Sequence, residues 1–317
     1  MTIKAKLKKS LHWLFVSAQR LGVDILPRHF YSQIPDIAKL RGTNRWRSAM
    51  SMHGVLGAAL ESQEAVFANW MERASHADTR AQSLTYLSAC GENGASGYGP
   101  TEAEVWFRMF HAIRPKQMIQ IGAGVSTAIA LDAMANRYAA NDRRLMTCEI
   151  TAIDPFPTDY LKRLARDKRI NLHIEPAQES SMALFERLDA GDVLFIDSTH
   201  TVSPGSEVNY LILEVLPRLK PGVLVHFHDI YFPYDYQRKL LHGELFFQSE
   251  STLLHAFLLN NKRFSIEFAL SALHYGKPES IKKYVASYRP EGNNDGLANT
   301  PEGHFPSAIY LRVNSDV

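Results

Sequence analysis

The chain has 317 residues, of which 45% are hydrophobic and 21% charged, an ordinary composition for a globular protein. Its 35 Lys and Arg residues nearly balance 33 Asp and Glu residues, and a net charge of +2 argues against a nucleic-acid partner. The two cysteines, Cys90 and Cys148, form no CxxC pair and predict neither a disulfide framework nor a thiolate metal site. No apolar run is long enough to span a bilayer, so we expect a cytoplasmic protein.

Residues 1–95 are expected to form a helical N-terminal extension, and residues 96–317 a second domain. The boundary is a glycine-rich stretch at 91–100, which is typical of a loop. The extension begins with four lysines in its first nine residues, followed by an apolar run at 11–16. This pattern fits a surface helix packed on its own domain, or a peripheral contact with an anionic membrane. It indicates no oligomeric state.

Strands and helices alternate after residue 100. Thr101 is expected to cap a helix over 102–110. The alternation predicts a parallel, doubly wound α/β sheet with helices on both faces. Two late strands are expected to pair antiparallel at its edge. The predicted strands cover 118–121, 147–153, 170–174, 193–196, 223–227, 264–270 and 307–313, and the helices between them 126–143, 158–166, 179–188, 206–219 and 244–260.

A glycine loop follows the first predicted strand. Gly122 allows a tight turn, and Gly124 allows close approach of a ligand to the backbone. Ser126 or Thr127 can cap the helix that follows. A dinucleotide site usually carries glycine where this chain has Thr127, so the loop favours a ligand without a pyrophosphate.

An acidic residue is expected at the end of the next strand to hold ribose hydroxyls. Asp154 follows that strand directly, whereas Glu149 lies within it. Ligands of open α/β sheets bind at the carboxyl ends of the strands, which favours Asp154. The alternative is that Asp154 only caps the turn at Pro155.

Two further strands end in polar residues that should meet at the same sheet edge. Asp197 and His200 follow one strand, and His226, His228 and Asp229 end the next. Because side chains alternate along a strand, His226 and His228 should share a face. Asp197, His228 and Asp229 could bind a divalent cation such as Mg²⁺. The alternatives are a general base at His200 or His228, or carboxylates that cap turns and histidines that bond to buried backbone.

These motifs together resemble the class I S-adenosylmethionine-dependent methyltransferases, of the bacterial methyltransferase domain 24 type. The resemblance implies a Rossmann-like, mostly parallel seven-stranded sheet whose last strand is antiparallel. It implies that S-adenosylmethionine lies over Gly122 and Gly124, that Asp154 takes the ribose position, and that Gln178 or Glu179 lies near the adenine. The matching stretches are 119–127, 151–155, 191–200 and 216–230.

The resemblance implies methyl transfer from S-adenosylmethionine to an oxygen or nitrogen of a small molecule or glycan. Many such enzymes carry an acid at the position of Gln120, whose amide can hydrogen-bond but carries no charge. The alternatives are a nicotinamide-dependent oxidoreductase and a non-catalytic Rossmann-like domain in envelope assembly. The catalytic candidates are His200, His228 and Asp229, and the cofactor-binding candidates are Gln120, Gly122, Gly124, Ser126, Thr127, Asp154, Gln178 and Asp197.

Overall fold

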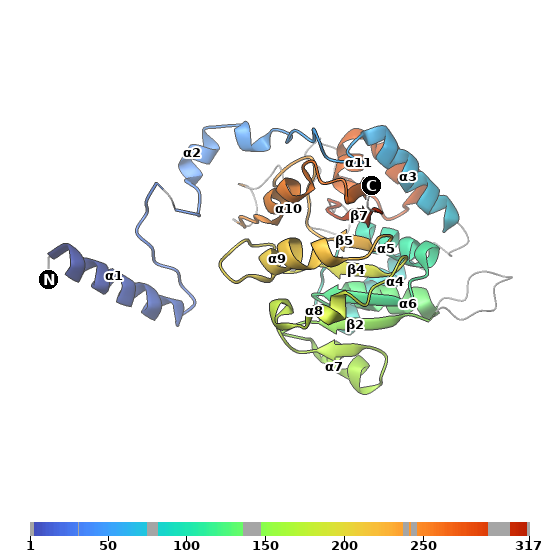
Figure 1. Cartoon of the computed structure of the whole chain (residues 1–317), viewed down its shortest axis with the longest axis horizontal. Coiled ribbons are helices and arrows are strands. Elements are labelled where there is room, and N and C mark those ends of the chain that lie inside the picture. The colour runs from blue at the N-terminus through green and yellow to red at the C-terminus, as the bar shows by residue number, and fades with distance from the viewer. Residues whose placement is uncertain are drawn as a thin grey trace. The chain divides into compact units, whose positions relative to one another are not determined.

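The computed structural model describes residues 3–30, 32–74, 82–135, 147–236, 241, 246–290 and 305–315. The chain divides into two compact units, Met1–Asn44 and Arg45–Val317. The first unit contains helices α1 (Ile3–Gln19) and α2 (Ile37–Arg41) (Figure 1). Residues 45–95 fall in the second unit with the sheet, and the expected domain limit at residue 95 stays a prediction.

None of the helices in the described part of the chain has the length and apolar character that crossing a membrane requires.

The second unit is built on a seven-stranded sheet in the order β3-β2-β1-β4-β5-β7-β6. Strands β1 to β5 pair in parallel, and β7 lies antiparallel to both of its neighbours, β5 and β6. The predicted doubly wound, mostly parallel sheet with a late antiparallel pair is therefore confirmed. The strands are β1 (Gln117–Ile121), β2 (Glu149–Ile153), β3 (Asn171–His173), β4 (Val193–Ile196), β5 (Leu224–Phe227), β6 (Phe264–Ala269) and β7 (Ile309–Val313).

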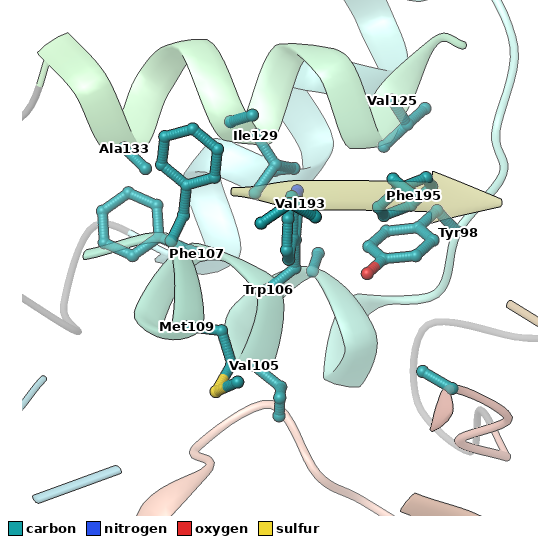
Figure 2. Close-up of a cluster of buried hydrophobic side chains, with 14 of the residues drawn as sticks. Tyr98, Val105, Trp106, Phe107, Met109, Val125, Ile129, Ala133, Val193 and Phe195 are labelled. Carbon is teal, nitrogen blue, oxygen red and sulfur yellow. The ribbon is translucent and has the colours of Figure 1, made fainter. Parts of the chain in front are cut away.

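Helices cover both faces of the sheet because successive side chains of each strand point to opposite sides. In β4, Val193 and Phe195 join one buried cluster and Leu194 and Ile196 the other. Figure 2 shows the first cluster, where Trp106 packs beside β4. Its helices are α3 (Leu60–Arg73), α4 (Gln82–Asn93), α5 (Pro100–Ile113), α6 (Val125–Ala135), α7 (Asp159–Arg166), α11 (Leu270–Gly276) and α12 (Pro278–Tyr284). The opposite cluster takes in α8 (Met182–Phe185), α9 (Glu207–Tyr210) and α10 (Glu250–Leu258).

Two helix predictions were wrong in detail. Thr101 does not cap α5, because that helix already begins at Pro100 after Gly99, and it has no side-chain cap. The helix expected over 179–188 is interrupted at Ser180, whose backbone is extended and whose hydroxyl donates to Glu175. Only a 3₁₀ turn and the short α8 form there.

Two other predicted helices extend beyond what the structure describes. The helix expected over 126–143 is seen to Ala135, and residues 136–146 lie outside the described residues. The helix expected over 244–260 forms only as α10: residues 246–249 are not helical, and residues 242–245 lie outside the described residues. The predicted helix over 206–219 forms, but its middle, Leu211–Val215, is a π-helical turn.

Candidate active site

The glycine loop after β1 is pressed against the end of β4. Gly122 has a φ of +71°, a left-handed conformation that favours glycine. A Cβ atom at this position would overlap the carbonyl oxygen of Asp197. The backbone N–H of Asp197 in turn donates to the carbonyl of Ile121 at 2.9 Å, and that of Gly122 donates to Ile153 at 3.1 Å. Glycine is therefore the residue that lets the loop pass between the ends of β2 and β4.

Three of the predicted cofactor-binding residues form one hydrogen-bonded set that holds this loop. The buried amide of Gln120 donates to Ser126 Oγ at 2.6 Å and accepts from Thr127 Oγ1 at 2.8 Å. Thr127 Oγ1 also accepts from the backbone N–H of Gly124 at 3.1 Å. Both the nitrogen and the oxygen of the Gln120 amide are thus hydrogen-bonded to residues that follow the loop. Neither Ser126 nor Thr127 caps α6, which begins one residue earlier, at Val125.

A cavity of about 250 Å³ lies over the loop. Its wall includes the backbone of 122–125, Ser126, Asp154 and Asp197. Asp154 accepts from the N–H of Ala123 at 3.1 Å and from that of Phe156 at 2.8 Å. This carboxylate therefore lines the cavity and also caps the turn after β2, and its role at the ribose stays a prediction. Gln178 bonds to the carbonyl of Gly205 instead and is not among the residues that line the cavity.

Three residues from the glycine-rich stretch before α5, Asn93, Gly97 and Tyr98, also line the cavity. Asn93, the last residue of α4, accepts from Thr158 Oγ1 at 3.0 Å, and its amide lies beside Gly124. Tyr98 has a φ of +51° and is buried. Its ring lies against Phe195, as Figure 2 shows, with a centroid distance of 5.5 Å. Neither Asn93 nor Tyr98 is among the site residues predicted from the sequence, and Asn93 carries no local signal of function.

The histidines of β5 and its end meet the ring of Tyr98. The Tyr98 hydroxyl lies 3.2 Å from Nε2 of His226, and the ring centroids of Tyr98 and His228 are 5.0 Å apart. Both imidazoles therefore lie on the face that Tyr98 covers, as alternation along the strand predicts. His226 is stacked between Trp106 and Phe195, and this burial lowers its pKa well below the ordinary value. A neutral, deeply packed imidazole suits a structural role.

The predicted polar residues at the ends of β4 and β5 come together around Asp197. Its Oδ1 lies 3.3 Å from Nδ1 of His228 and 3.4 Å from Nε2 of His200. Asp229 lies near the same two ring nitrogens, 3.7 Å from Nδ1 of His228 and 3.6 Å from Nε2 of His200. His200 and Asp229 both have left-handed backbones, with φ of +58° and +56°. We call Asp197, His200, His228 and Asp229 the polar cluster.

A residue that the sequence did not single out completes this arrangement. Glu250, the first residue of α10, is buried, and its Oε2 lies 2.8 Å from Nδ1 of His200. The backbone N–H groups of Ser249 and Glu250 both donate to the carbonyl of His200. The start of α10 therefore contacts both the ring and the carbonyl of His200. The other ring nitrogen, Nε2, faces Asp197 and Asp229.

The charges of the polar cluster stabilise one another. Burial alone would lower the pKa of His228, but the charges of Asp229 and Asp197 raise it to about 9. Burial also opposes protonation of His200, yet hydrogen bonds to Asp197 and Glu250 raise its pKa well above the ordinary value. Burial would raise the pKa of Asp197 and Asp229, and the two histidines lower it instead. The cluster consequently holds two cationic imidazoles between carboxylates.

The metal site predicted at Asp197, His228 and Asp229 has no support from this geometry. Among the described His, Cys, Asp and Glu side chains, no group of three or more is arranged to hold a metal ion. Asp197 and Asp229 instead face the two imidazoles.

The seven-stranded order with an antiparallel β7, together with the glycine loop and the acid after β2, defines an α/β domain of the class I methyltransferase type. Residues 119–230 match the family described as "Methyltransferase domain", and this segment spans β1 to the end of β5. The segment 119–230 is therefore similar to a methyltransferase domain, the class that the sequence motifs predict.

Individual proteins are more distant. An uncharacterised protein of Archaeoglobus fulgidus is 27% identical over 196 residues, which cover 59% of this chain and 85% of that protein. Among solved structures, the O-methyltransferase TomG of Streptomyces achromogenes, in complex with SAM, is 10% identical with a TM-score of 0.44, over 75% of this chain and 91% of TomG. The 1,6-didemethyltoxoflavin-N1-methyltransferase of Burkholderia thailandensis is 15% identical with a TM-score of 0.36, over 81% of this chain and 92% of that enzyme.

Proposed function

We propose that this protein binds S-adenosylmethionine over the 122–126 loop and transfers its methyl group to an oxygen or nitrogen of a small molecule or glycan. One observation carries the proposal. Asp197 lines the cavity over the glycine loop and also contacts both histidines of the polar cluster. The cavity proposed for the methyl donor and the polar cluster therefore share a carboxylate.

The residues of the cavity fit the proposed cofactor. Gly122 and Gly124 place no side chain at two positions of the loop, so that backbone can approach a ligand closely there. Asp154 lies at the carboxyl end of β2, the position expected to accept hydrogen bonds from ribose hydroxyls. When bound, S-adenosylmethionine supplies an electrophilic methyl group on a sulfonium. The chain's own task is then to orient the acceptor, which is a large part of rate enhancement in such reactions.

Deprotonation of the acceptor is assigned to the neutral form of His200, which forms at alkaline pH because Asp197 and Glu250 raise the pKa of this ring. Glu250 fixes Nδ1 of this ring, which leaves Nε2 as the atom that can take a proton. Two carboxylates, Asp197 and Asp229, face Nε2 and stabilise the imidazolium that results. Glu250 is thus a positioning residue for His200, in the way that a buried carboxylate orients the histidine of a catalytic triad.

Calorimetry with S-adenosylmethionine, S-adenosylhomocysteine and NAD tests the cofactor assignment. We expect binding of both sulfur compounds and none of NAD. Asp154→Ala should weaken S-adenosylhomocysteine binding on the order of tenfold, because a charge-assisted hydrogen bond is lost. Asp159→Ala is the matched control, since this exposed carboxylate lies on α7 and contacts Lys162. Tight NAD binding with no response to either sulfur compound would favour a nicotinamide-dependent oxidoreductase and overturn the proposal.

A second assay separates an enzyme from a binding domain of the same fold. Methyl transfer from labelled S-adenosylmethionine is measured over a panel of hydroxyl- and amine-bearing small molecules and glycans. Transfer to any acceptor that depends on His200 supports the proposal. Cofactor binding without transfer to any of them would favour the non-catalytic alternative.

A further inference from the structure

The charge of the chain is divided unevenly between its two compact units. Residues 1–44 contain eight Lys and Arg against two Asp, a net charge of +6. Residues 45–317 contain the other 27 basic and 31 acidic residues, a net charge of −4. The first acidic residue of the chain is Asp24, and four lysines fall in the first two turns of α1. The overall charge of +2 therefore conceals a strongly basic unit.

The same unit exposes large apolar side chains. On α1, Leu11, Trp13 and Leu14 are exposed, with 70% of the Trp13 surface open. The segment after α1 continues the pattern, and its exposed residues include Leu21, Leu26 and Phe30. Exposed apolar residues of this size in succession mark a binding surface rather than ordinary surface composition.

We propose that α1 and the segment through Phe30 lie on an anionic lipid surface. Lysines attract phosphate-bearing headgroups, and each basic residue near such a surface contributes about 1 kcal/mol to binding. Trp, Leu and Phe side chains insert at the boundary between headgroups and acyl chains. Because α1 is a helix of 17 residues that does not have the character of a membrane span, it lies in the plane of the interface.

Charge and shape together favour lipid over the other partners of a basic surface. A nucleic acid would use the lysines but has no binding site for the aliphatic Leu11, Leu21 and Leu26. A second copy of this unit would bring two charges of +6 together, which opposes association. The residues between Gly22 and His29 have no regular secondary structure, and a fluid interface accommodates an irregular apolar surface without a complementary partner shape.

Vesicle co-sedimentation of the full chain tests this proposal. We expect binding to vesicles of 70% phosphatidylcholine and 30% phosphatidylglycerol, little binding to pure phosphatidylcholine, and a decrease as salt rises, since salt screens the attraction. Replacing Lys4, Lys6, Lys8 and Lys9 by Ser should weaken binding on the order of tenfold or more. The double variant Trp13→Ser, Phe30→Ser should weaken it to a similar extent.

Matched controls lie on the other unit. Lys162→Ser with Lys282→Ser removes two exposed lysines, and Leu213→Ser removes an exposed leucine; these variants should bind as the unchanged protein does. Absence of binding to phosphatidylglycerol vesicles in 0.1 M salt overturns the proposal. So does binding that the control variants reduce as much as the test variants. A dimer in analytical ultracentrifugation that is lost on Trp13→Ser, without vesicle binding, assigns the surface to a second copy and also overturns it.

Discussion

Nδ1 of His200 lies 2.8 Å from Oε2 of Glu250, a buried carboxylate that follows it by 50 residues. Such a contact fixes which ring nitrogen carries the proton and aims the other nitrogen at the reaction. The proposed deprotonation of the acceptor depends on this pair more than on any other contact of the polar cluster.

Replacing Glu250 by Gln should slow methyl transfer about tenfold to a hundredfold and leave S-adenosylhomocysteine affinity unchanged. The amide keeps the shape of the side chain but removes the charge that raises the pKa of His200. The pH at which the rate rises should therefore move to lower values. Rates and affinity are measured from pH 6 to 10. Glu214→Gln, at an exposed ion pair with Arg218, is the control. An unchanged pH profile would remove Glu250 from its positioning role.

His200→Ala should lower the rate of methyl transfer by about 10² to 10⁴, the range typical of a lost general base. Affinity for S-adenosylhomocysteine should be retained, because His200 is not among the residues that line the cavity. Single-turnover kinetics and calorimetry on the same sample separate the two effects. A variant that loses cofactor affinity and keeps its rate at saturation would show that His200 belongs to the binding site instead.

EDTA should leave the rate of methyl transfer unchanged if His200 acts as a general base. Asp197 and Asp229 are the acidic partners of the imidazoles, and the proposed mechanism uses them in that role. The rate is measured after dialysis against EDTA, and again after adding back Mg²⁺ or Mn²⁺. Loss of activity that either ion restores would support the divalent cation predicted at Asp197, His228 and Asp229.

Stability should decrease on the alkaline side through His228. Its pKa is about 9 in the folded protein against 6.5 ordinarily, so its stabilising contribution is complete below pH 6.5 and is lost as the pH rises through 9. The contribution is on the order of 3 kcal/mol. Urea unfolding at pH 6, 8 and 10 measures it, and His228→Asn should flatten the decline. The lowered pKa of Asp229 acts oppositely, with stability present above about pH 4 and lost as the pH falls. If the free energy of unfolding falls equally from pH 8 to 10 in the unchanged protein and in His228→Asn, the alkaline loss of stability does not come from His228.

Gly122→Ala should destabilise the fold by about 3 kcal/mol or more, because the added methyl group overlaps the carbonyl of Asp197. Gly205→Ala is a matched control. It has a similar φ of +76° but open space around the position, so only the backbone penalty of about 1 kcal/mol applies. Thermal unfolding of both variants gives the difference. Equal losses of stability in Gly122→Ala and Gly205→Ala would mean that the loop moves to accommodate the added methyl group.

The sheet and the loop were predictable because their signals are local. Buried parallel strands appear as short apolar runs, and the glycines stand directly after the first of them. Asn93 and Glu250 were not predictable in the same way. Asn93 lies before the predicted domain, and Glu250 reaches His200 through tertiary packing, so neither has a neighbouring motif to mark it. Gln120 was predicted to bind the cofactor and is not among the residues that line the cavity; only the folded structure shows that Ser126 and Thr127 bond to both ends of its amide.

The contact between Gly122 and the backbone of Asp197 also limits how this domain can be redesigned. The turn at Gly122 would carry the cofactor, and Asp197 contacts His200, the proposed base. These two positions touch through main-chain atoms, without an intervening side chain that could absorb a change. A substitution that widens the loop at Gly122 for a bulkier methyl donor will therefore also shift Asp197. Directed evolution toward new donors should therefore recover paired substitutions near residues 122 and 197, and seldom single ones.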